Sequence, residues 1–184
     1  MKKLMSLIPL AWLLLAAPAF AVDGTALLQQ LDRKMEPETY EMVRKLVNIE
    51  PDGTRKEFVL YSVKKGKDRI AALFLDPASE RDRATLRLGE NMWLYIPNVG
   101  KPVRITSLQS VTGGIFHNAD ILALELSVEY TVEKVVEEAA TYTLSLKART
   151  GDVAYDRLTM KVDRKTTLPL SIECFAASGL LIKT

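Results

Sequence analysis

The sequence has one cysteine, Cys174, and one histidine, His117, among its 184 residues. A single cysteine excludes an intramolecular disulfide framework and any zinc site built from several cysteines. A single histidine excludes every catalytic or metal-binding motif that requires two. Cys174 falls on the apolar side of an expected strand, so we expect a buried, unreactive thiol and not a nucleophile.

Sequence motifs for nucleophilic catalysis and phosphate binding are also missing. The chain contains no G-x-S-x-G elbow, and Gly113-Gly114 lacks the further glycine and the lysine of a phosphate-binding loop. His117 and Asp120 are spaced for a shared metal ion, but two ligands alone are weak support for a metal site. We therefore expect no catalysis, no metal and no cofactor.

The longest apolar run of the chain lies at its amino terminus. Lys2 and Lys3 precede an apolar run over residues 4–17, and Ala19-Phe20-Ala21 follows. This is the three-part pattern of a secretory signal peptide, so we expect cleavage after residue 21. The alternative, a retained membrane anchor, needs about 20 continuous apolar residues. The expected product is a periplasmic protein, and because no cysteine follows the cleavage site, it would not be acylated there.

An excess of one charge is also absent from the expected mature chain. Without Lys2 and Lys3 it has 23 basic residues against 23 acidic ones. Such a balance gives no broad electrostatic footprint for nucleic acid or anionic lipid. We therefore expect no nucleic-acid partner and only transient contact with membranes.

The mature sequence is organised as one helix followed by many strands. Leu27, Leu28, Leu31 and Met35 share one helical face, which predicts a short amphipathic helix over residues 25–35. Strand-length segments separated by turn signals then follow to the end of the chain. Tight turns imply antiparallel pairing, because a parallel crossover needs about a dozen residues. We expect residues 132–140 to form a pair of strands, and residues 112–120 to form an ordered functional loop.

This pattern predicts a mainly β fold with short helices, an α+β protein. Nine or more antiparallel strands with one apolar face imply an incomplete, strongly curved β-barrel with helices over its concave face. Along residues 92–96, apolar side chains alternate with Trp93 and Tyr95, so we expect both faces of that strand to be covered.

Large apolar side chains gather on one face of several expected strands. Periodicity alone favours the plain core of a β-sandwich, and the alternative is a cavity for an apolar ligand. The candidate cavity residues are Leu60, Phe74, Met92, Leu94, Ile96, Leu144, Leu146, Leu158, Met160, Leu170 and Ile172.

Three segments together resemble a known family. The string Met92-Trp93-Leu94-Tyr95-Ile96-Pro97, the strand Val103-Arg104-Ile105-Thr106, and the loop from Gly113 to Asp120 are similar to motifs of the bacterial outer-membrane lipoprotein-sorting proteins, which have a LolA-like fold. The turn from Val162 to Leu170 adds to the likeness, which covers most of the mature chain.

The resemblance implies a single half-barrel domain over residues 22–184 whose cavity accommodates acyl chains of a lipid or lipoprotein. It also implies a link to inner-membrane transporters of the resistance-nodulation-division type. Arg104 and Asp120 match motif positions, and one hypothesis joins them as a polar latch between strand and loop. Relatives continue for several strands beyond the position of Thr184, which leaves two alternatives: the chain is an independently functional carrier, or it lacks its last strands and a partner or a second copy completes the sheet.

Two functions follow as hypotheses. The first is a non-enzymatic periplasmic carrier that shields acyl chains in its cavity. The second is a sensor or docking module for a membrane transporter or regulator, which carries nothing and fills its interior with its own side chains.

Overall fold

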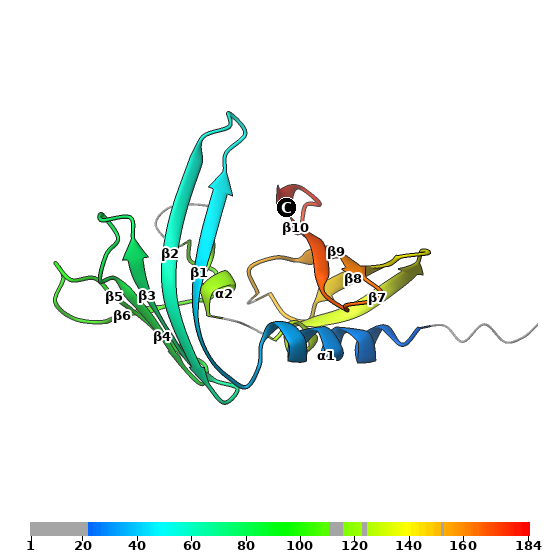
Figure 1. Cartoon of the computed structure of the whole chain (residues 1–184), viewed down its shortest axis with the longest axis horizontal. Helices are drawn as coiled ribbons and strands as arrows, with labels where there is room; N and C mark the ends of the chain where they lie inside the picture. Colours follow the sequence, from blue (N-terminus) through cyan, green and yellow to red (C-terminus); the bar gives the residue numbers. More distant parts are fainter. Residues whose placement is uncertain (1–21, 111–115, 123–124, 152) are drawn as a thin grey trace, which may run out of the picture.

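The chain folds into two antiparallel sheets joined by short helices (Figure 1). The computed structural model describes residues 22–110, 116–122, 125–151 and 153–184, so the predicted leader and Gly113-Gly114 lie outside the described residues. The elements in chain order are α1 (Gly24–Met35), β1 (Thr39–Ile49), β2 (Arg55–Lys65), β3 (Arg69–Asp76), β4 (Ala84–Leu88), β5 (Asn91–Tyr95), β6 (Val103–Ile105), α2 (Asn118–Ile121), α3 (Leu126–Glu129), β7 (Tyr130–Glu137), β8 (Thr141–Ala148), β9 (Arg157–Asp163), β10 (Pro169–Phe175) and β11 (Leu181–Lys183).

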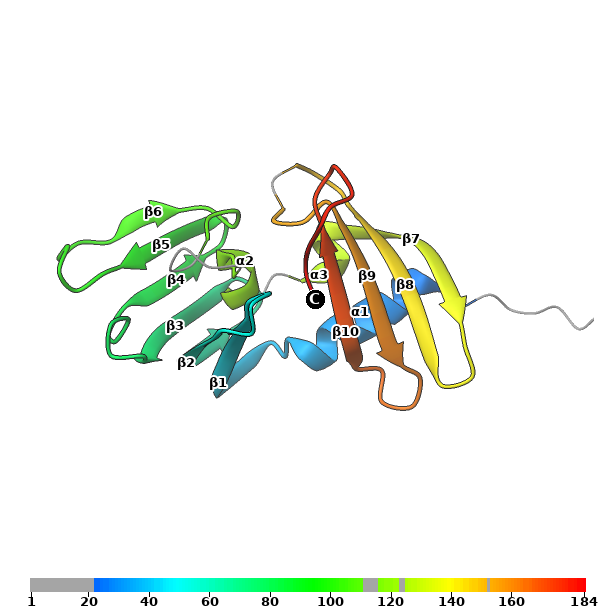
Figure 2. The same cartoon turned by 90° about the horizontal axis from the view of Figure 1, so that it is seen from above.

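Both sheets are meanders, as the tight turns predict. The first sheet has the order β1-β2-β3-β4-β5-β6 and the second has the order β11-β10-β9-β8-β7. This confirms the predicted class, a mainly β, open and curved antiparallel fold with few helices. The sheet is divided in two because the segment between β6 and β7 is too long for a hairpin and holds α2 and α3. Figure 2 shows the two sheets side by side, with α1 along the second.

Helix α1 covers the inner face of the second sheet. The Asp23 carboxylate caps its first turn by accepting hydrogen bonds from two backbone amides. Leu27, Leu28 and Leu31 form its buried face and pack into one hydrophobic cluster with residues of β8 and β9. Gly24 allows close approach, because a Cβ atom there would lie only 2.6 Å from Val135 Cγ2.

The first sheet has a separate hydrophobic core. Leu60, Ile70 and Phe74 on its inner face are buried together with Ile121 and Leu122 at the end of α2. The short helix α2 therefore covers this sheet in the way that α1 covers the second. The helices over the two concave faces agree with the predicted arrangement, although α2 and α3 have no clear sequence pattern.

Two sequence predictions are wrong. Residues 132–140 do not form a pair of strands, because a single strand, β7, runs to Glu137 and the chain then turns into β8. The outer face of β5 is not covered: Tyr95 is 38% exposed and Trp93 is only half-buried. The sequence shows that both faces of the strand carry apolar side chains. It does not show whether another element packs on either face.

Buried polar contacts fix α1 to both halves of the molecule. Asp32, which is 7% exposed, accepts hydrogen bonds from Leu126 N at 3.0 Å and Ser127 N at 2.7 Å, and so caps α3 from another helix. At the end of α1, the backbone carbonyl of Glu36 accepts a hydrogen bond from the buried Lys64 of β2. The Glu36 carboxylate accepts a further hydrogen bond from the hydroxyl of Tyr40.

No helix in the described part of the chain combines the length and apolar character that crossing a bilayer requires.

Replacing Asp32 tests this attachment. We expect Asp32→Ala to lower the free energy of unfolding by about 2 kcal/mol, because two amides at the start of α3 lose their acceptor. Urea unfolding followed by circular dichroism measures the change. Asp32→Asn keeps one acceptor oxygen and should cost less, and an unchanged midpoint for Asp32→Ala would contradict the assignment.

Candidate functional site

A cavity of about 340 Å³ lies between the two sheets. Its walls come from Leu46 of β1, from residues in and next to α2 and α3, and from the inner faces of β9, β10 and β11. Its surface is mainly apolar, with Leu126, Leu158 and Ile172 among the lining side chains. The volume falls at the lower end of the range for small-molecule pockets.

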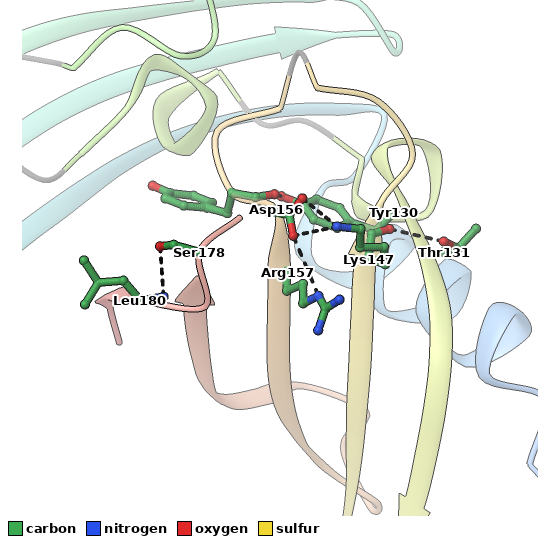
Figure 3. Close-up of polar contacts among 8 residues, drawn as sticks. Tyr130, Thr131, Lys147, Asp156, Arg157, Ser178 and Leu180 are labelled. Atoms are coloured by element: carbon green, nitrogen blue, oxygen red, sulfur yellow. Dashed lines mark hydrogen bonds and ion pairs between the residues drawn. The ribbon is translucent and has the colours of Figure 1, made fainter. Parts of the chain in front are cut away.

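The segment just before β9 forms part of the cavity wall, and contacts on its side away from the cavity hold it in place. Asp156 accepts hydrogen bonds from Lys147 Nζ on both carboxylate oxygens at 2.6 Å, and Arg157 Nε lies 3.7 Å away (Figure 3). The backbone of Asp156 also bonds to Ala148 and to Phe175. Tyr155, which directly precedes this anchor, lines the cavity together with Val153 and Ala154.

A polar cluster lies on one side of the cavity, and we call it the mouth cluster: Asp120, Tyr155 and Lys183, with His117 adjacent. Asp120 Oδ2 accepts hydrogen bonds from Lys183 Nζ at 2.6 Å, Tyr155 Oη at 2.9 Å and the backbone amide of His117 at 2.8 Å. His117 Nδ1 lies 2.9 Å from Tyr155 Oη. Asp120 belongs to α2, which packs on the first sheet, whereas Lys183 belongs to the second. The mouth cluster therefore joins the two halves.

Burial keeps the hydroxyl and thiol groups of the cavity protonated. It raises the pKa of Tyr155 and of Tyr130, and nearby Asp120 adds to the effect at Tyr155. Burial also raises the pKa of the Cys174 thiol to about 11. At neutral pH the cavity thus presents an apolar wall, neutral hydroxyls and an ion pair. Among the described residues, no group of three or more His, Cys, Asp and Glu side chains could hold a metal ion.

Two of the eleven predicted cavity residues, Leu158 and Ile172, line this cavity. The others are placed elsewhere. Three lie in the core of the second sheet, behind the cavity wall: Leu144, Leu146 and Met160. Three lie in the core of the first sheet: Leu60, Phe74 and Met92. Leu94 and Ile96 are half-buried and do not line the cavity.

Leu170 is the clearest departure from the predicted set, because its side chain is 60% exposed. Pro169 pairs with Val162 and Ser171 pairs with Lys161, so Leu170 is the extra residue of a β-bulge. A bulge breaks the strict alternation of faces, which the sequence pattern assumed. Cys174, further along the same strand, is 5% exposed and lines the cavity, which confirms the prediction of a buried thiol.

Sequence reasoning missed the parts of the wall that come from loops and short helices. Phe116, Leu126, Val153 and Tyr155 all line the cavity, and none belongs to a strand. The alternation argument applies only to strands and therefore could not find them. The expected functional loop gave a partial signal, since Phe116 and Asp120 fall within it.

The predicted latch between Arg104 and Asp120 is wrong in its first partner. The Arg104 guanidinium lies over the ring of Trp93, 5.6 Å from its centroid, on the outer face of the first sheet. Asp120 lies with α2 on the inner side and bonds to Lys183 and Tyr155. The loop aspartate does take part in a latch, but a lysine of the second sheet completes it.

If Lys183 and not Arg104 is the partner of Asp120, substitutions of Asp120 and of Arg104 should have different effects on the rate at which Cys174 is labelled. With a pKa of about 11, only about one thiol in a thousand is ionised at pH 8, so maleimide labelling should be slow. Asp120→Ala leaves the ammonium of Lys183 without its acceptor and should increase the labelling rate several-fold as the two halves separate. Arg104→Gln is the control and should leave the rate unchanged. An equal increase in both variants would contradict the mouth cluster.

The fold is shared with solved bacterial proteins. A LolA superfamily protein from Nitrosomonas europaea superposes with a TM-score of 0.69 at 24% identity, covering 88% of this chain and 75% of that one. A DUF1329 family protein from Desulfovibrio piger has a TM-score of 0.69 at 20% identity, covering 86% and 74%. A Vibrio parahaemolyticus domain described under outer membrane lipoprotein sorting has a TM-score of 0.62 at 18% identity, again covering 86% and 74%.

These likenesses confirm the LolA-like fold that the sequence motifs indicate. No curated protein matches the chain. A family model described as an uncharacterized protein matches residues 66–184, which is more than half of the chain. The chain therefore belongs to the family of uncharacterized proteins that this model describes, and its fold is that of the LolA superfamily.

Proposed function

We propose that this protein is a periplasmic carrier that binds an acyl chain of a lipid or lipoprotein in the cavity between its two sheets. The observation that carries the proposal is the cavity itself, an apolar space of about 340 Å³ that the protein's own side chains leave unfilled. The signal-peptide pattern of residues 1–21 and the LolA-like fold support the compartment and the class of ligand.

The volume of the cavity limits how much hydrocarbon it can hold. A methylene group is similar in size to a water molecule, about 30 Å³, so the space fits roughly ten methylenes. Burying each one contributes about 0.8 kcal/mol, or about 8 kcal/mol in total before the costs of ordering are subtracted. Those costs leave an affinity that is micromolar or weaker, which permits release of the ligand.

The polar groups suggest how a ligand would be oriented. The mouth cluster and Glu129 are the charged part of a lining that is otherwise mainly apolar. A bound hydrocarbon tail would contact Leu158, Ile172 and Cys174, and its polar head would stay near Asp120 and Lys183, where water can reach it. The transporter partner implied by the sequence resemblance stays a prediction.

Filling the cavity tests the proposal. Ala154 lines the cavity, and Ala154→Phe would occupy the volume of several methylenes. We expect this variant to reduce uptake of a fluorescent fatty-acid probe about ten-fold, since each lost methylene contact weakens binding. Titration with fluorescence detection measures the change, and mass spectrometry of organic extracts identifies lipid that co-purifies without detergent.

Ala26→Phe is a matched control, because Ala26 is exposed on α1 and lies outside the cavity. It should bind the probe like the parent protein. Probe binding should also slow maleimide labelling of Cys174 in the parent and not in Ala154→Phe. Absence of both co-purified lipid and probe uptake in the parent protein would overturn the carrier function.

A further inference from the structure

A second apolar hollow lies on the outer face of the first sheet, away from the cavity. We call it the outer groove; it has a volume of about 430 Å³ and is lined mainly by Ala71, Leu86, Leu88, Trp93, Tyr95 and Pro102. Leu86 is 37% exposed and Leu88 is 43% exposed. Helix α2 packs on the other face of this sheet, and the second sheet lies on that side too (Figures 1 and 2).

The groove is continuous across the strands. The register places Ala71 opposite Leu86, Leu86 opposite Trp93, and Trp93 opposite Arg104. This row of side chains crosses β3, β4, β5 and β6 on one face of the sheet. Apolar side chains in such a row would ordinarily be covered by another layer, and in the described part of the chain no element covers them.

Basic residues surround the groove. Arg69 lies opposite Leu88, Arg104 lies over the ring of Trp93, and Lys101 precedes Pro102. Lys65 is exposed at the end of β2, on the same face as Val63. Within the described residues none of these four cations forms an ion pair.

Acidic residues near the groove are fewer and lie at its margins. Asp68 and Glu90 are in the turns at one end of the strands. Glu41 on β1 accepts a hydrogen bond from the hydroxyl of Tyr61 and lies opposite Val63. The surface next to the exposed aromatic rings is therefore predominantly positive.

From this juxtaposition we propose that the outer groove docks the protein on a membrane surface that contains anionic phospholipids. Trp and Tyr side chains favour the boundary between headgroups and acyl chains, and Lys and Arg side chains favour a negatively charged lipid surface. A second copy of this chain fits less well, because packing two outer faces together would place the same cations against one another. The inference concerns a separate surface and does not depend on what the cavity binds.

Vesicle binding tests the proposal directly. The protein is purified after export, and its mass establishes the loss of residues 1–21, which contain the other tryptophan, Trp12. Trp93 is then the sole tryptophan and reports on the groove. We expect co-sedimentation with vesicles of phosphatidylethanolamine and phosphatidylglycerol, a blue shift of Trp93 emission and quenching by brominated acyl chains. Binding should weaken at high salt.

Charge variants distinguish binding through the outer groove from general electrostatic attraction between the protein and anionic vesicles. Removing one Lys or Arg near an anionic surface should weaken binding about five-fold, so Arg69→Gln with Arg104→Gln should weaken it about 25-fold. Lys45→Gln with Arg55→Gln is the matched control. Lys45 and Arg55 lie on strands β1 and β2, and both form ion pairs with Glu57. Replacing them removes the same net charge as replacing Arg69 and Arg104. An equal loss in both double variants would overturn the proposal.

Apolar variants test the groove itself. Leu86→Ser with Leu88→Ser should reduce binding at least ten-fold and remove the blue shift, since less apolar surface enters the headgroup region. Val128→Ser with Leu180→Ser is the control, because both residues are highly exposed and lie outside the groove, on α3 and just before β11. Unchanged thermal unfolding and unchanged uptake of the fatty-acid probe in all variants would show that fold and cavity are intact.

Three other outcomes would count against the proposal. Sedimentation with neutral phosphatidylcholine vesicles as strong as with anionic ones would exclude the charge-based mechanism. A blue shift that grows with protein concentration without vesicles would assign the groove to a second copy of the chain. Absence of vesicle binding, with normal probe uptake, would leave the carrier function in place and remove the membrane-docking surface.

Discussion

The geometry of the cavity depends on the two acidic residues that attach α1 to the rest of the chain. Asp32 caps α3 at the start of the second sheet, and Glu36 bonds to Lys64 and Tyr40 of the first. One turn at the end of α1 separates the two residues, and the leucines that precede Asp32 are embedded in the core of the second sheet. Buried polar contacts at the end of α1 therefore connect the two sheets, and the mouth cluster connects them beside the cavity.

The fold was more predictable from the sequence than the site. Turn residues and two-residue alternation define most strands, because both depend on neighbours along the chain. The same alternation could identify Leu158 and Ile172 as inward-facing. It could not distinguish the wall of a cavity from a filled core, which is why Leu144, Leu146 and Met160 were placed in the same set. Whether an apolar face meets a neighbour or empty space is decided by tertiary arrangement.

Departures from the predicted site have one local cause and one long-range cause. The bulge at Leu170 adds a residue that no pattern of apolar side chains reveals, and it turns that side chain outward. The partner of Asp120 was misassigned because the motif places Arg104 near it in sequence, whereas strand alternation puts the guanidinium on the opposite face of the sheet. Lys183, the actual partner, is 63 residues away, and a separation of that size leaves no sequence signal.

The division between the two sheets affects how the proposed carrier would adapt to ligands of different width. In the described part of the chain, the ladders of backbone hydrogen bonds run within each sheet and none crosses from β6 to β7 or from β1 to β11. Amide hydrogen exchange should accordingly remain slow inside each sheet even while the space between them fluctuates. Each half can move as an intact unit, so the proposed carrier would admit a wider ligand by exchanging a few side-chain contacts and without breaking the pairing of any two strands.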